Sequence, residues 1–230
     1  MVEKCDVGMC VAAMSGIAPA VLFDLDGTVW DSIPGIVASL RHALEVVHVE
    51  VPAEPLQRFI GPPLAAMLAD VGVPNDRIEA GWKAYRERYH SEGVYEASLY
   101  PDARQLLDHL ARSGRRLATA TSKGEVATGI MLDHFGLTEF FEVVGAAPMD
   151  STAHSKVDVI GFVLDQLGPV DTGTTAMVGD RHYDIEGGRH FGLRTVAVTW
   201  GYGSAEERDA CAPDAVVSDM DELRRALIST

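Results

Sequence analysis

Residues 20–28 read Ala-Val-Leu-Phe-Asp-Leu-Asp-Gly-Thr, and this stretch decides the fold. Its apolar start predicts a short buried strand. Asp24 and Asp26 follow two residues apart, so if the strand expected at residues 20–25 continued through Asp26, their side chains would share one face. Carboxylates held this close repel each other and shift each other's pKa, and a cation between them would offset that cost. Gly27 allows the backbone to turn sharply, and Thr28 adds a hydroxyl.

Two structural explanations compete with a chemical role for this stretch. Asp and Gly are ordinary turn residues, so an Asp-x-Asp-Gly turn at a strand end is one of them. The apolar strand before Asp24 and the hydroxyl of Thr28 after Gly27 favour a catalytic or metal-binding role over a simple turn. A helix-loop-helix calcium loop also begins Asp-x-Asp, but it needs Glu at its twelfth position, which here is Gly35. The calcium loop is therefore excluded.

Composition narrows the classes of partner. The formal net charge is -15 and no basic patch is visible, so we expect no nucleic-acid partner. The three cysteines, Cys5, Cys10 and Cys211, are too widely spread for a disulfide framework, which favours a reducing cytoplasmic location. No apolar run is long enough to span a membrane, and the first residues lack the cationic start of a secretory signal.

Two hydrophobic patterns divide the chain. From Pro34 to about Tyr95, apolar residues recur at helical spacing and no alternating strand pattern is found. From Pro101 onward, short apolar strands alternate with helices, which predicts a parallel sheet covered on both faces. The expected strands are 117–121, 141–146, 175–179, 195–199 and 215–217, and the expected helices are 102–113, 126–135, 156–167, 184–191 and 220–228.

We therefore expect an α/β fold with a Rossmann-like parallel sheet and an inserted α-helical cap. The core comprises residues 19–33 and 98–230, and the cap comprises residues 34–97, inserted after the first strand. Residues 1–18 are expected to form a tail outside the fold. Open parallel sheets bind ligands at the carboxyl ends of their strands. Residues whose side chains can take part in catalysis or metal binding fall at these ends. They are Asp24, Asp26, Thr121, Ser122, Lys123, Asp180 and Asp184, and Lys156 begins a helix.

The acids among these residues predict a metal site. Asp180 and Asp184 are four residues apart and share a face on the first turn of a helix. With Asp24 and Asp26 they would form a cluster of four acids. Either of the later two can cap the helix, but capping does not need both. A hard cation with oxygen ligands would resolve the repulsion, and Mg²⁺ fits best because it also binds substrate phosphate.

This set of residues suffices for phosphoryl transfer. An aspartate can attack phosphorus to form an aspartyl-phosphate, and a second acid can protonate the leaving oxygen and then activate water. Thr121 can hold a phosphoryl oxygen, and Lys156 can neutralise charge. A lone lysine is usually a solvated surface charge, and Lys123 fits that explanation as well as a functional one.

Four motifs in this order resemble the phosphatase branch of the haloacid dehalogenase superfamily. Phe23-Asp24-Leu25-Asp26-Gly27-Thr28 resembles the first motif, which implies Asp24 as nucleophile and Asp26 as acid/base. Ala120-Thr121-Ser122-Lys123 resembles the second, which implies a phosphate-binding Thr121. Lys156 resembles the lysine of the third. Gly179-Asp180-Arg181-His182-Tyr183-Asp184 resembles the fourth, which implies Asp180 and Asp184 at a Mg²⁺ that is also held by Asp24 and the backbone carbonyl of Asp26.

The resemblance extends to the inserted block and sets the functional expectation. Phe59-Ile60-Gly61-Pro62-Pro63-Leu64 is similar to a cap segment of the phosphoglycolate phosphatase group. We expect a Mg²⁺-dependent phosphomonoester hydrolase acting on a small phosphate ester, 2-phosphoglycolate first. Candidate substrate contacts are Gly27, Ser122 and Arg58. The resemblance disfavours a dehalogenase, because the phosphatases need the acid at Asp26.

Three alternatives stay open. One is a 5'-nucleotidase-like phosphatase, and another is a phosphomutase, for which no feature argues. The third is a non-catalytic regulator with the same fold, which the presence of every motif residue disfavours. Ordinary packing or surface roles are favoured for His182 and His190 and for Trp82, Tyr85 and Tyr89, whereas Trp30 fits packing and a place at the cap seam equally.

Overall fold

The computed structural model describes residues 19–52, 55–60, 64–148 and 155–228 of the 230. The expected tail at residues 1–18 lies outside these ranges. Six strands form one parallel sheet in the order β5-β4-β1-β6-β7-β8. Their bounds are β1 Ala20–Phe23, β4 Arg116–Gly124, β5 Val143–Ala147, β6 Ala176–Gly179, β7 Arg194–Val198 and β8 Ala215–Val217. The expected α/β class with a Rossmann-like parallel sheet is confirmed.

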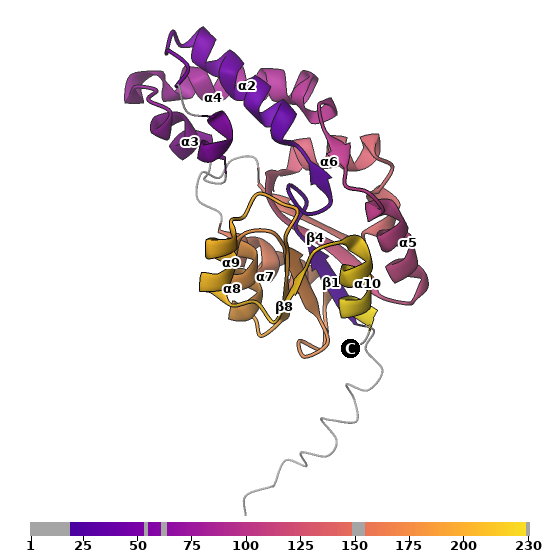
Figure 1. Cartoon of the computed structure of the whole chain (residues 1–230). Coiled ribbons are helices and arrows are strands. Elements are labelled where there is room, and N and C mark those ends of the chain that lie inside the picture. The colour runs from indigo at the N-terminus through magenta and orange to yellow at the C-terminus, as the bar shows by residue number, and fades with distance from the viewer. Residues whose placement is uncertain (1–18, 53–54, 61–63, 149–154, 229–230) are drawn as a thin grey trace, which may run out of the picture.

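Side chains alternate between the two faces of the sheet, and helices cover both faces. On β1, Val21 and Phe23 face the apolar cluster that contains residues of α5 (Ala103–Arg112), α6 (Glu125–His134) and α10 (Met220–Ile228). Ala20 and Leu22 face the other side, where α7 (Lys156–Leu167) packs. This period of two is what a strand buried on both faces requires. Figure 1 shows α5 and α10 on one side of the sheet, with α7 and α8 (His182–His190) on the other.

The first strand ends earlier than residues 20–25, and the chain turns at once. The backbone amides of Thr28, Val29 and Trp30 all donate to the carbonyl of Leu25, at 3.1, 2.8 and 3.2 Å. Gly27 has φ +81°, a conformation that favours glycine because it has no Cβ. Asp24 and Asp26 therefore do not lie on a continuing strand, and the expected shared face is wrong. The tight turn sends their side chains to different partners.

A helical insertion follows this turn. It contains α2 (Ile33–Val46), α3 (Leu64–Asp70) and α4 (Ile78–Ser91), with short 3-10 turns at Leu56–Phe59, Asn75–Arg77 and Gly93–Tyr95. Leu40, Leu44 and Leu68 are fully buried between these helices. Figure 1 shows the three helices stacked beyond the sheet, with α2 in indigo and α4 in magenta. The described part of the insertion contains helices and no strand, as its pattern predicts.

Three features escape the sequence patterns. A two-stranded antiparallel ladder, β2 (Trp30–Asp31) with β3 (Ser98–Leu99), joins the start and end of the insertion. A further helix, α9 (Ala205–Cys211), packs on α8. A fourth 3-10 turn lies at Thr138–Phe140.

Among the described residues, every helix is too short or too polar to cross a bilayer.

Candidate active site

Three buried acids meet beside the carboxyl end of β1. Asp24 follows β1, Asp180 follows β6, and Asp184 lies in the first turn of α8. Because β1 and β6 are neighbours in the sheet, the three side chains converge, and one carboxylate oxygen from each lies within 4.8 Å of the others. All three residues are at most 7% exposed. The expected cluster of four acids contains three, because the carboxylate of Asp26 has other partners.

Lys156 is the cation inside this cluster. Its ammonium lies 2.9 Å from Asp24 Oδ1, 2.8 Å from Asp184 Oδ1 and 2.9 Å from the carbonyl oxygen of Ala120. The start of α7 is fixed by Ser155, whose hydroxyl accepts the amide of Asp158 at 3.2 Å. Lys156 is the first residue of that helix, so the cap also sets where its side chain begins.

Small residues on α8 make room for the stem of Lys156. A Cβ added to Gly187 would lie 2.9 Å from Ile160 Cδ1 and 3.1 Å from Lys156 Cγ. Gly187 thus lets α8 approach α7 closely, whereas Gly188 lets α8 lie against the sheet, where an added Cβ would be 2.8 Å from Met177 Cβ. This approach brings Asp184 to the ammonium of Lys156.

Electrostatics show that one lysine does not balance three buried acids. Burial raises the pKa of Asp24 to about 6; the Lys156 ammonium opposes this, whereas the Asp184 and Asp26 carboxylates add to it. Burial, together with Asp184 and Asp24, raises the pKa of Asp180 well above its ordinary value. Burial alone would lower the pKa of Lys156, but Asp184 and Asp24 outweigh it and raise that pKa.

The donor set fits a hard divalent cation. Asp180 Oδ1 is buried and, among the described residues, has no hydrogen-bond partner, although a buried polar atom normally has one. Its other oxygen, Oδ2, accepts the amide of Tyr202 at 2.6 Å. Asp184 differs, because its Oδ2 accepts the amide of Arg181 at 3.0 Å and its Oδ1 contacts Lys156. Asp184 therefore caps α8 and positions Lys156, whereas Asp180 Oδ1 and Asp24 are oxygens that Mg²⁺ prefers.

Three side chains contact the carboxylate of Asp26 and hold it apart from the three buried acids. Its Oδ1 accepts the Trp30 indole N–H at 2.7 Å and the Ser32 hydroxyl at 2.6 Å. Its Oδ2 lies 2.9 Å from the ammonium of Lys123. The phenol of Tyr202 lies 3.3 Å from the Ser32 hydroxyl and accepts the Ser32 amide at 2.8 Å. Trp30 is completely buried, so it both packs and orients Asp26.

The other predicted site residues are Thr121, Ser122, Gly27 and Arg58, and the first three differ in burial and in their contacts. Thr121 is 1% exposed, and its hydroxyl accepts the amide of Lys123 at 3.2 Å. Ser122 is exposed beside it. Gly27 lies against the acid cluster, since a Cβ there would come within 2.8 Å of Asp180 Cγ. The side chain of Arg58 lies outside what the structure describes, so its expected substrate contact stays a prediction.

The loop after β7 holds Asp180 in place, and sequence reasoning missed it. Gly201 and Gly203 let this loop lie against Asp180, because a Cβ on either would overlap Asp180 atoms. The indole of Trp200 donates to the carbonyl of Thr28 at 3.1 Å, which ties the loop to the turn after β1. The signal was available: residues 200–203 read Trp-Gly-Tyr-Gly and directly follow an expected strand, where an open sheet binds ligands.

A second contact set surrounds the start of α8. Glu207 of α9 accepts the Arg181 guanidinium at 2.9 Å and the amide of His182 at 2.8 Å, and the His182 ring lies 2.6 Å away. Burial would raise the pKa of Glu207, but these donors lower it to about 2. Arg181 also donates to the carbonyl of Ile60 at 3.4 Å, which links α8 to the insertion. The favoured packing role of His182 agrees with these contacts.

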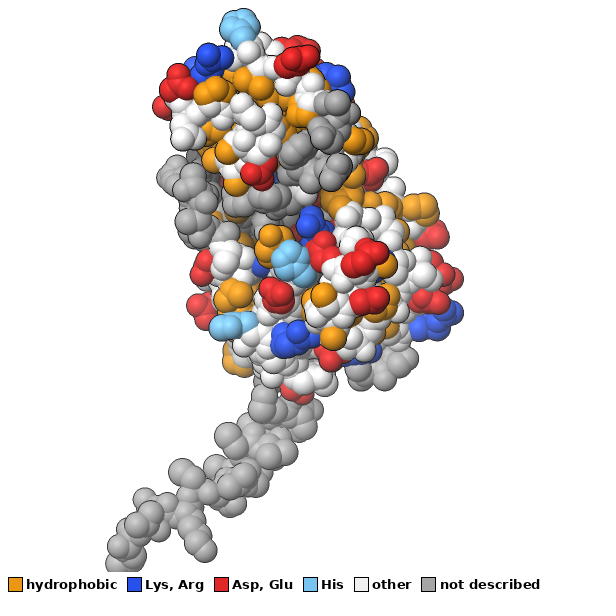
Figure 2. All heavy atoms as spheres, turned by 60° about the vertical axis from the view of Figure 1, so that its left-hand side comes forward, with side chains coloured by type: hydrophobic (Ala, Val, Ile, Leu, Met, Phe, Trp, Pro, Cys, Tyr) orange, Lys and Arg blue, Asp and Glu red, His pale blue; other side chains and the backbone are white. Residues whose placement is uncertain are grey.

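Charges on one visible face agree with the acidic composition. In Figure 2, acidic side chains are spread over both the insertion and the core, and the Lys and Arg side chains do not gather in one patch.

Tyr85 and Tyr89 of α4 are buried, with ring centroids 5.4 Å apart, which agrees with the expected packing role. Tyr89 has an additional contact, because its hydroxyl accepts the Lys123 ammonium at 2.6 Å.

Comparisons with known proteins agree with this geometry. The model of the haloacid dehalogenase-like hydrolase family matches residues 21–198. Tyrosine-protein kinase PtkA of Mycobacterium tuberculosis is 41% identical over 220 residues, which cover 94% of this chain and 75% of that protein. A 5'-nucleotidase of Pseudomonas aeruginosa is 33% identical over 213 residues, covering 92% and 96%. A phosphoglycolate phosphatase of Neisseria meningitidis is 29% identical over 218 residues, covering 89% and 91%.

Solved structures give the same result. A haloacid dehalogenase-like hydrolase from Streptococcus pneumoniae superposes with a TM-score of 0.81 at 28% identity, covering 90% of this chain and 96% of that one. The resemblance predicted from the four motifs is confirmed. The chain belongs to the haloacid dehalogenase-like hydrolase family, as a member of its phosphatase branch.

Proposed function

We propose that this enzyme is a Mg²⁺-dependent phosphomonoester hydrolase that acts on a small phosphorylated metabolite, with 2-phosphoglycolate as the first candidate. The observation that carries the proposal is the convergence of Asp24, Asp180 and Asp184, with Lys156 in contact with Asp24 and Asp184, beside a separately held Asp26. The phosphoglycolate phosphatase among the relatives supports the choice of substrate. The helical insertion at residues 34–97 would act as a cap over the core.

The proposed chemistry has two balanced steps. In the first, a carboxylate oxygen of Asp24 attacks phosphorus, the bond from phosphorus to the ester oxygen breaks, and that oxygen takes a proton from Asp26. In the second, Asp26 takes a proton from water, whose oxygen attacks phosphorus. The acyl phosphate then breaks to release inorganic phosphate and restore the Asp24 carboxylate. Asp26 regains in the second step the proton that it donates in the first, so the enzyme is unchanged at the end of the cycle.

The other residues hold charge and position. Lys156 contacts the proposed nucleophile directly, so it would neutralise the negative charge that gathers there. The buried hydroxyl of Thr121 would donate to a phosphoryl oxygen. Mg²⁺ held by Asp24, Asp180 and the backbone carbonyl of Asp26, with Asp184 in support, would supply positive charge against the phosphoryl oxygens.

Phosphate release from a panel of esters tests the proposal. We expect wild-type protein with Mg²⁺ to hydrolyse 2-phosphoglycolate, and Asp24→Asn to lose that activity while keeping its thermal unfolding temperature. Nucleotide hydrolysis without 2-phosphoglycolate hydrolysis would instead identify the 5'-nucleotidase alternative, which the Pseudomonas relative supports. Undiminished phosphate release by Asp24→Asn would refute the mechanism.

The mycobacterial relative adds a second candidate, the transfer of a phosphoryl group to a protein tyrosine. It rests on the 41% identity to a protein named a tyrosine kinase. Incubation with radiolabelled ATP, with and without a tyrosine-containing acceptor protein, distinguishes the candidates. Labelled acceptor together with no release of phosphate from small esters would favour the kinase.

A further inference from the structure

Lys123 lies where the core, the proposed acid/base and the insertion meet. It follows Thr121 and Ser122 on β4, and its side chain is 5% exposed. Its ammonium lies 2.9 Å from Asp26 Oδ2 and 2.6 Å from the hydroxyl of Tyr89 on α4, and 4.7 Å from the centre of that ring. A buried ammonium is costly unless it is well paired, so this position calls for an explanation.

The two lysines of the site differ in their remaining donors. An ammonium has three N–H groups. Lys156 has three acceptors, on Asp24, Asp184 and Ala120, so its donors are all engaged. Within the described part of the chain, Lys123 has two polar partners, Asp26 and Tyr89. One N–H of Lys123 is therefore left for a ligand.

The position of Lys123 relative to Asp26 determines which part of a ligand it can meet. An acid that protonates a leaving oxygen must come within about 3 Å of it. The Lys123 ammonium lies 2.9 Å from a carboxylate oxygen of the same residue. Lys123 would therefore lie close to the leaving group, whereas Lys156 contacts Asp24, the proposed nucleophile, and so serves the phosphoryl side.

We propose that Lys123 is a specificity-determining residue that binds an anionic group next to the ester oxygen of the substrate, with Tyr89 positioning its ammonium. This inference rests on the proposed phosphatase function and narrows the substrate class. In 2-phosphoglycolate a single carbon separates the ester oxygen from a carboxylate, which suits the free N–H. In a 5'-nucleotide a neutral ribose occupies that place, so the site favours short acidic alcohols over nucleosides as leaving groups.

A matched pair of substrates isolates this role. 2-Hydroxyethyl phosphate keeps the ester carbon of 2-phosphoglycolate but carries a hydroxymethyl group in place of the carboxylate. A hydrogen bond to a charged group is worth about 1.5–3 kcal/mol, which corresponds to about 10- to 150-fold. We expect wild-type protein to prefer 2-phosphoglycolate in kcat/KM by a factor in this range. Lys123→Met should reduce that preference to about threefold or less.

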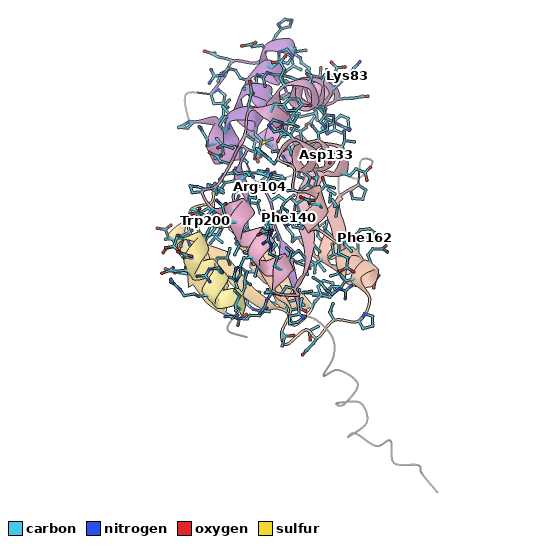
Figure 3. All side chains as sticks on the ribbon, turned by 90° about the vertical axis from the view of Figure 1, so that its right-hand side faces the viewer. Lys83, Arg104, Asp133, Phe140, Phe162 and Trp200 are labelled. Carbon is cyan, nitrogen blue, oxygen red and sulfur yellow. The ribbon has the colours of Figure 1, made fainter. Side chains whose placement is uncertain are left out.

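The ratio of the two substrates separates binding from indirect effects. Lys123 also contacts Asp26, so Lys123→Met affects both substrates through that acid, and this common effect cancels in the ratio. Tyr89→Phe removes the hydroxyl partner and should lower the preference less than Lys123→Met does. Lys83→Met is the control, because its side chain is 74% exposed on α4, far from the sheet (Figure 3). It should keep the wild-type preference.

Binding measurements keep the test independent of turnover. Calorimetry on Asp24→Asn, with and without Lys123→Met, gives the affinities for both esters in the presence of Mg²⁺. Tighter binding of 2-phosphoglycolate that depends on Lys123 supports the inference even if wild-type protein hydrolyses neither ester, an outcome that would refute only the proposed function. An unchanged preference in Lys123→Met, or equal wild-type handling of the two esters, would overturn the inference and leave a general phosphatase function standing.

Discussion

Adding one methyl group at Gly201 should disable the site without removing any functional group. A Cβ at Gly201 would overlap Asp180 Cβ and the carbonyl oxygen of Gly27, and would lie 2.6 Å from Asp180 Oδ2. These atoms cannot move aside freely, because Asp180 is 1% exposed and its Oδ2 is bonded to the amide of Tyr202. Gly201→Ala must therefore displace Asp180, the loop or the turn after β1.

The expected magnitude follows from this overlap. Overpacking a close-packed site costs about 1–3 kcal/mol, which for a chain of this length lowers the unfolding temperature by several degrees. A displacement of about 1 Å in a catalytic group can cost about 100-fold in rate. We expect kcat/KM for 2-phosphoglycolate to fall by at least that factor, and Mg²⁺ to stabilise the variant less than the wild type.

Gly129→Ala is the matched control for the same chemical change. Gly129 lies within α6, and nothing in the structure lies within 4 Å of a Cβ added there. Alanine in the interior of a helix is more stable than glycine by about 0.5–1 kcal/mol, so this variant should unfold slightly later and keep its activity. Thermal unfolding and phosphate release are measured on both variants. Wild-type stability and activity in Gly201→Ala would refute the reasoning.

Three further predictions concern the charges of the site. Lys156→Met should destabilise the protein by about 3–5 kcal/mol in denaturant unfolding without metal, because Asp24 and Asp184 lose their buried partner. Mg²⁺ at 100 times its Kd should stabilise wild-type protein by about 2.7 kcal/mol, and Asp180→Asn should lose most of this gain in thermal unfolding. Glu207→Gln should cost about 1 kcal/mol in unfolding free energy at pH 7, because solvent screens this partly exposed group, with the cost vanishing as the pH falls from about 4.5 to 2.

The sign of the Glu207 effect follows from its depressed pKa of about 2. A carboxyl whose pKa is lower in the folded state contributes stability above its unfolded pKa and loses it as the pH falls through the folded value. A cost that grew below pH 4 would contradict this. Unchanged stability of Lys156→Met would show that the acids are not paired as described, and an undiminished Mg²⁺ effect in Asp180→Asn would place the metal elsewhere.

Strong periodicity made most of the fold predictable. After Pro101, short apolar runs alternate with helices that carry an apolar face, and the expected bounds of Lys156–Leu167, Ala215–Val217 and Met220–Ile228 match the structure. Weak patterns explain the failures. The α9 helix has Cys211 as its buried residue and no apolar stripe, and β2 and β3 have two residues each, too few for a pattern to show.

The candidate site was predictable where its residues sit at strand ends and unpredictable where they depend on a turn. Asp24 and Asp180 meet because β1 and β6 are neighbours, as the rule for open parallel sheets implies. The partners of Asp26 depend on the three amides that donate to the carbonyl of Leu25, and Gly27 indicates a turn without specifying that geometry. Lys123 could not be distinguished from a surface lysine until the side chains of Asp26 and Tyr89 were placed beside it.

The ladder between β2 and β3 has a consequence for how the insertion tolerates change. Trp30 pairs with Leu99 and Asp31 with Ser98, so the chain leaves the sheet layer and returns to it at the same point. The two ends of the insertion are therefore as close together as the two strands of a hairpin, whatever the length of the segment between them. Closing such a loop costs only about 0.6 kcal/mol more for each doubling of its length. Segments of very different size can thus occupy this place while the strands below keep their register.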